Sequence, residues 1–82
     1  MTIDEAIQNL TNTIRSTSPE AVIRIQRRSA DSTSIRAYAP AAHEQPIKDA
    51  TQEMTLNLLI QDGLDVQVLV YDIATSLPPD QD

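Results

Sequence analysis

The chain has 82 residues, a formal net charge of −6 at pH 7, no cysteine, and two tyrosines as its only aromatic residues. This length is that of one small domain with a thin core, and without cysteine the chain has no disulfide, thiolate nucleophile or cysteine metal site. No apolar run reaches the ~18–20 residues of a membrane span, and the negative charge works against general affinity for phosphate backbones.

The first predicted element is an amphipathic helix over Ile3–Arg15. Thr2 and Glu5 fit a capping box, in which a hydroxyl and a carboxylate each satisfy an orphan backbone amide. Pro19 ends the helix, because it disfavours helical geometry in the preceding residue. One apolar stripe recurs at helical spacing: Ile3, Ile7, Leu10 and Ile14.

Two alternating segments, Ala21–Arg28 and Ser34–Ala39, then predict an antiparallel hairpin around the polar loop Ser29–Thr33. The buried face carries Ala21, Ile23, Ile25, Ile35, Ala37 and Ala39. The opposite face carries Val22, Arg24, Gln26, Arg28, Ser34, Arg36 and Tyr38. Arg27 has the parity of the buried face, and we expect it past the edge of the core, near the loop.

The next segment predicts a second helix over Ile47–Gln61, with Pro46 in its first turn. Gly63 suits the left-handed position after the helix, and Leu64 could fold back onto Leu59. Asp62-Gly63 is also a strong hairpin signal, which would pair 55–61 with 64–71. That register would place Ile60 opposite Asp65 and mix apolar and acidic side chains on one face. The helix is therefore the preferred interpretation.

Asp65–Ile73 alternates most clearly and predicts the third strand, with Val66, Val68 and Val70 on one face and Gln67, Leu69, Tyr71 and Ile73 on the other. A helix between the second and third strands makes them parallel, and a right-handed crossover places both helices on one sheet face. The predicted fold is α+β, with an α-β-β-α-β order and a three-stranded sheet whose strand order stays open. Residues 1–74 form the domain and 75–82 a disordered acidic tail.

This element order is similar to that of the KH-like and BolA-like topologies. The likeness is one of order and covers most of the chain. KH nucleic-acid sites use a Gly-x-x-Gly loop, whereas this chain has only Gly63. BolA-like proteins act in iron–sulfur trafficking through histidine and a glutaredoxin cysteine, and His43 alone does not carry that role over. A shared order of elements does not establish function, so neither a family nor a function is assigned from this likeness.

Candidate catalytic residues are few. His43 is the only histidine, and a general base or metal ligand needs partners close in space. Glu44 is the only obvious partner. We therefore expect His43 to lie in a solvated loop, and we expect His43→Ala to leave folding and function nearly unchanged. Asp62 and Asp65 lack the alternating acids of a calcium loop. We predict no enzyme activity, no metal and no cofactor.

The charge is unevenly distributed. Four of the six cations lie between Glu20 and Ala39, a segment that sums to +2 and leaves −8 for the rest of the chain. Arg24, Arg28 and Arg36 should share the open sheet face. One interpretation is a solvated face that pairs with the protein's own acids; the other is a docking site for an anionic partner.

We therefore predict a small, cytoplasmic interaction or adaptor module, forming a homodimer, that binds a protein partner through its open sheet face. The candidate partner-binding residues are Val22, Arg24, Arg28, Arg36, Tyr38, Leu69 and Tyr71. Leu56 and Ile60, on the outer side of the second helix, offer a smaller alternative surface. The alternative function is an RNA- or DNA-binding accessory domain that uses the arginine face.

Overall fold

The computed structural model describes residues 2–75. Its elements are helix α1 (Ile3–Thr17), strands β1 (Val22–Arg27) and β2 (Ser32–Ala39), helix α2 (Glu44–Asn57) and strand β3 (Asp65–Asp72). A 3-10 turn (Ala41–His43) precedes α2, and a π-helical turn (Leu58–Asp62) extends it. The predicted α+β class and α-β-β-α-β order are confirmed. The predicted tail lies, apart from Thr75, outside the described residues.

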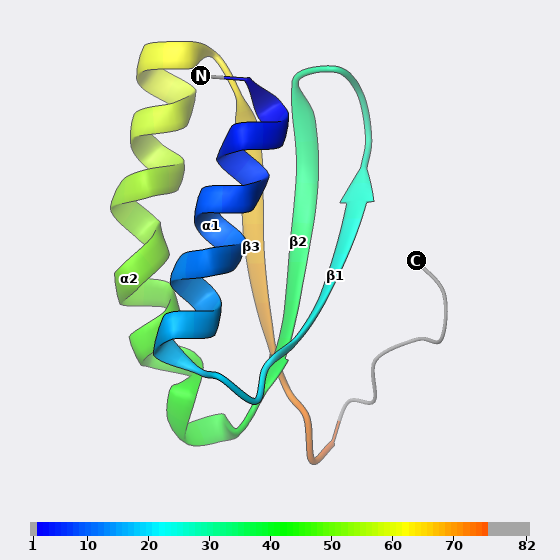
Figure 1. Cartoon of the computed structure of the whole chain (residues 1–82), viewed down its shortest axis with the longest axis vertical. Helices are drawn as coiled ribbons and strands as arrows, with labels where there is room; N and C mark the ends of the chain where they lie inside the picture. Colours follow the sequence, from blue (N-terminus) through cyan, green and yellow to red (C-terminus); the bar gives the residue numbers. More distant parts are fainter. Residues whose placement is uncertain (1, 76–82) are drawn as a thin grey trace.

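The sheet has the strand order β1-β2-β3, so β2 is central. β1 and β2 are antiparallel, and β2 and β3 are parallel. Both helices lie on one face of this sheet (Figure 1). The alternative hairpin around Asp62-Gly63 is excluded, because residues 55–61 belong to α2 and its π-helical extension.

The core lies between that sheet face and the two helices. Strand alternation is as predicted, with Ile35, Ala37 and Ala39 of β2 fully buried. The remaining members of the core are Ala6, Leu10 and Ile14 of α1, Ile47 of α2, and Leu58, Leu64 and Val66. Each fully buried Leu, Ile or Val contributes about 1.5–3 kcal/mol of transfer free energy.

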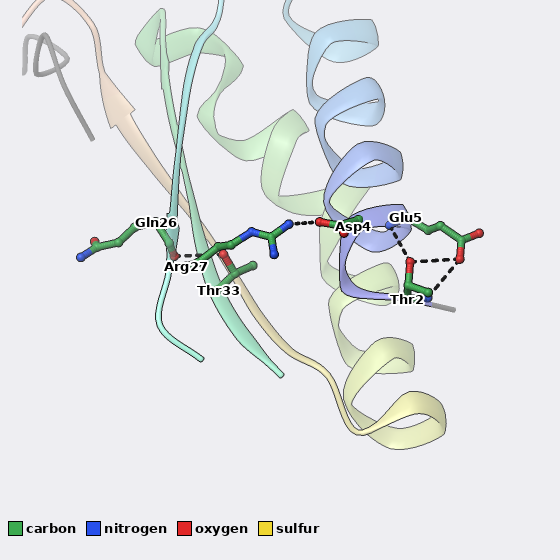
Figure 2. A network of polar contacts seen from close by, with 6 residues as sticks. All are labelled: Thr2, Asp4, Glu5, Gln26, Arg27 and Thr33. Atoms are coloured by element: carbon green, nitrogen blue, oxygen red, sulfur yellow. Dashed lines mark hydrogen bonds and ion pairs between the residues drawn. The ribbon is translucent and has the colours of Figure 1, made fainter. Parts of the chain in front are cut away.

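Helix α1 begins at the predicted capping box (Figure 2). The Thr2 hydroxyl accepts a hydrogen bond from the Glu5 N–H at 3.2 Å, and the Glu5 carboxylate accepts from the Thr2 N–H at 3.1 Å. The bond from the Thr2 backbone, reinforced by the Thr2 hydroxyl, lowers the pKa of Glu5. α1 runs two residues further than Arg15 because Pro19 constrains only Ser18, which is extended.

Two elements begin earlier than the sequence predicts, whereas β1 begins one residue later, at Val22 rather than Ala21. β2 begins at Ser32 rather than Ser34, since the N–H groups of Arg28 and Ser29 both donate to the Ser32 carbonyl. The Thr33 hydroxyl also donates to the Gln26 carbonyl at 2.9 Å (Figure 2). These bonds shorten the loop and extend the ladder.

The second early start is that of α2, which begins at Glu44 rather than Ile47. Pro46 nevertheless lies in its first turn, as predicted, where a missing N–H leaves no helix bond unmade.

The end of α2 closes through Leu58. Gly63 adopts the left-handed conformation expected of it, with φ 66°. The N–H groups of Gly63 and Leu64 both donate to the Leu58 carbonyl. Because the last turn is π-helical, the carbonyl that accepts from the Leu64 N–H is that of Leu58, one residue before Leu59. The Leu59 side chain is 53% exposed, while Leu64 is buried. The closure therefore does not need the predicted contact between Leu64 and Leu59.

Replacement of Gly63 tests this closure. A Cβ added at Gly63 would meet no described atom within 4 Å, so its cost is conformational and not steric. We expect Gly63→Ala to lower the free energy of unfolding by about 1–2 kcal/mol, the cost of the left-handed region for an L-residue. Gly63→Asn is the matched control and should lose less, because asparagine tolerates this conformation. Urea denaturation measures both; equal losses would contradict the conformational explanation.

Candidate functional site

The sheet face opposite the helices carries the predicted partner-binding residues in cross-strand rows. One row is Arg24, Arg36 and Leu69, and the next is Val22, Tyr38 and Tyr71. A third row, Gln26, Ser34 and Gln67, lies on the other side of the first. The structure thus brings together six of the seven candidates, in adjacent positions on three strands.

Arg24 and Arg36 are directly opposite each other on neighbouring antiparallel strands. Like charges in this position repel each other. Arg36 donates from Nη2 to the Gln26 side-chain oxygen at 2.8 Å, and Arg24 donates from Nη1 to the Ile23 carbonyl at 3.2 Å. A hollow of about 80 Å³ is lined by Arg24, Ile25, Gln26 and Arg36. Two guanidinium groups beside a small hollow are suited to a carboxylate.

The tyrosine row is largely covered. The rings of Tyr38 and Tyr71 are stacked, with centroids 5.2 Å apart and planes 21° from parallel. Tyr38 is only 6% exposed, so its ring contributes to the fold and offers little area to a partner. Tyr71 and Val22 are half-buried, and Leu69 is 36% exposed. The accessible apolar part of this face is therefore centred on β3.

Arg28, the seventh candidate, lies one residue beyond β1, and its side chain is exposed. Arg27 lies on the helix side of the sheet, as expected from its parity, and forms an ion pair with Asp4 of α1 (Figure 2). The Arg27 and Asp4 side chains are 56% and 72% exposed, so this pair contributes at most about 1 kcal/mol. The structure thereby separates Arg27 from the arginines of the open face.

His43 differs from expectation. Its Nδ1 lies 2.7 Å from the Oγ of Ser18, whose side chain is fully buried at the end of α1. The pair joins the end of α1 to the turn before α2, and His43 is half-buried rather than in a solvated loop. A buried hydroxyl with no exposed surface is not placed to attack a substrate. The geometry is that of a structural tether.

The third row contains a buried hydroxyl. Ser34 is 1% exposed, and its Oγ has no hydrogen-bond partner among the described residues. Its neighbours in the row are Gln26 and Gln67, and Arg36 lies two positions along β2. Because the Arg36 side chain bonds to Gln26, it extends along the face toward Ser34. The polar part of this face is therefore more closed than strand alternation predicts.

Two further features of the described part of the chain bear on function. Within residues 2–75, no group of three or more histidine, cysteine, aspartate or glutamate side chains is arranged to hold a metal ion. Over the same residues, no helix combines the length and apolar character needed to cross a membrane.

The comparisons with known proteins give no relative. No protein-family model, no curated protein and no solved structure matches the chain. The function must therefore be argued from this chain alone.

A double-mutant cycle tests the tether. We expect His43→Ala to lower the free energy of unfolding by about 1–3 kcal/mol, because it leaves the buried Ser18 hydroxyl unsatisfied. Ser18→Ala should cost less, because the half-buried His43 can then bond to water. The double variant should cost less than the sum, since the two residues contact each other. Urea denaturation of the wild-type protein and the three variants gives the coupling free energy between Ser18 and His43. A His43→Ala variant with an unchanged free energy of unfolding would contradict the tether.

Proposed function

We propose that the protein is a small, non-catalytic interaction module, acting in the cytoplasm, whose open sheet face binds an acidic segment of a protein partner. The observation that supports this is the cross-strand pair Arg24 and Arg36, with the 36% exposed Leu69 next to it in the same row. The β1–β2 register holds these two positive charges opposite each other, although the chain as a whole has a net charge of −6.

The chemistry of the row fits such a partner. A carboxylate between two guanidinium groups accepts charge-assisted hydrogen bonds and relieves their repulsion. Leu69 and the half-buried Tyr71 then contribute apolar contact beside the charged pair. An apolar centre with a charged border is the ordinary composition of a protein interface. A nucleic-acid partner is less well supported. The rest of the chain has a net charge of −8, which works against long-range attraction to a phosphate backbone.

Replacement of the two arginines tests the proposal. Immobilised protein is exposed to a nuclease-treated extract of the native cell, and the retained protein is identified and titrated. Arg24→Gln together with Arg36→Gln should weaken its binding at least tenfold, because each hydrogen bond to a charged group contributes about 1.5–3 kcal/mol. Raising the salt should also weaken binding, since the Debye length shrinks to about 8 Å at physiological ionic strength.

Arg15→Gln is the matched control. It makes the same substitution, with the loss of one positive charge, at an exposed position on α1 on the other side of the sheet. Binding should be unchanged in this variant. Equal binding by the arginine-pair variant at low salt would assign Arg24 and Arg36 to solvated surface, and retention that nuclease treatment abolishes would favour the nucleic-acid alternative.

A further inference from the structure

Three of the four exposed large apolar side chains of the described residues gather where α2 passes into its π-helical extension. Leu56, Leu59 and Ile60 are 54%, 53% and 70% exposed, whereas Leu58 between them is buried. Positions three and four apart are neighbours on a helix surface, so the three exposed side chains form one stripe. α2 lies on the side of the molecule away from β1 (Figure 1). We call this stripe of Leu56, Leu59 and Ile60 the α2 patch.

The α2 patch adjoins a hollow between the helix and the start of β3. The hollow has a volume of about 280 Å³ and is lined by Gln52, Thr55, Leu56, Leu59, Asp65 and Val66. An apolar cavity of about 150 Å³ is large enough for benzene, so this hollow has room for an apolar side chain of a partner. Asp65 is exposed, and the hollow therefore offers a carboxylate as well as apolar contact.

The surroundings of the α2 patch are acidic. Residues 49–75 include five acidic side chains and no lysine, arginine or histidine. Glu53 precedes the patch on α2, and Asp65 lies beside the hollow; neither forms an ion pair with a described residue. Lys48, the only cation in the sequence of α2, already pairs with Glu44 at 3.5 Å. The patch therefore combines apolar contact with uncompensated negative charge.

We propose that the α2 patch binds an amphipathic helix of a protein partner, with apolar side chains on one face and lysine or arginine beside them. The apolar side chains enter the hollow and cover Leu56 and Leu59, while the cations pair with Glu53 and Asp65. A helix fits because the patch runs along the axis of α2, where an apolar helical face can lie against it.

This inference goes beyond the proposed function, because it concerns the other side of the molecule. The α2 patch lies on the helix side of the sheet, and Arg24 and Arg36 lie on the open side. The two surfaces also differ in charge. An acidic partner on one and a basic partner on the other do not compete, so the module can join the two.

Charge distinguishes a basic helix from the other occupants of an apolar patch. Nucleic acid and anionic lipid headgroups are repelled by the same acids that attract a basic helix. A second copy of the chain brings an identical acidic patch and a net charge of −6, which opposes two-fold pairing through the patch. The basic helix is the occupant that matches the patch in both charge and shape.

A synthetic helix tests the inference on the full chain. The probe is a peptide of about 20 residues of leucine, lysine and alanine, with its leucines along one helical face, because shorter helices are marginal in water. NMR titration of the isotope-labelled protein should give saturable shift changes at the amides of residues 52–60, Asp65 and Val66. A scrambled peptide of the same composition has no apolar face and should bind at least tenfold more weakly.

Variants at exposed positions separate the apolar contribution from the charged one. Leu56→Gln with Leu59→Gln should weaken peptide binding at least tenfold, because less apolar area is then buried. Leu69→Gln, the same change on the open sheet face, is the control and should leave binding unchanged. Glu53→Gln should weaken binding about two- to fivefold, as expected of an exposed ion pair, whereas Glu20→Gln after the end of α1 should not.

Several results would overturn the inference. The first is no saturable binding at millimolar peptide, and the second is equal binding of the scrambled peptide. Shift changes spread over acidic residues throughout the chain would show charge attraction without a site. Self-association of the peptide-free protein that Leu56→Gln with Leu59→Gln abolishes would show that a second copy occupies the patch. Arg24→Gln with Arg36→Gln should not weaken peptide binding, so this inference and the proposed function can fail separately.

Discussion

The parallel pairing of β2 with β3 is the constraint on which the rest of this structure depends. Parallel neighbours cannot be joined by a tight turn, so the chain must cross over the sheet between them. Helix α2 makes that crossing and covers the same face as α1 (Figure 1). Within residues 2–75 the pairing therefore leaves the opposite face without a helix and places β3 at an edge of the sheet. Both proposed binding surfaces, the open sheet face and the outer side of α2, are consequences of this one connection.

The central strand shows how so small a chain supplements a thin core. β2 is buried on both faces, with Ile35, Ala37 and Ala39 toward the helices and Tyr38 on the other side. The chain has no phenylalanine or tryptophan, so its two tyrosines are the largest apolar groups available. Their stacking across β2 and β3 adds a second, smaller buried region. The open face therefore contributes to stability as well as offering exposed groups.

The sequence was most informative where the pattern is local. Helical spacing predicted α1, alternation predicted the inward residues of all three strands, and Gly63 marked the end of the second helix. It was least informative where residues distant along the chain meet. Ser18 and His43 are 25 residues apart, and nothing in either segment shows that these loops adjoin. Tyr38 alternates as an outward residue, and its burial depends on the parallel register that places Tyr71 beside it. The position of β3 at an edge likewise follows from the strand order, which the sequence left open.

The two proposed binding surfaces are among the places where the molecule departs from what folding alone favours. A sequence optimised for stability would not place Arg24 opposite Arg36, since the repulsion lowers stability. Nor would it leave Leu56, Leu59 and Ile60 exposed on the outer side of α2, since an exposed apolar patch favours aggregation. Many other local rules agree, as in the capping box, the alternation of β2 and the glycine after α2. Such isolated departures in a consistent sequence are expected where binding, rather than folding, determines the residue.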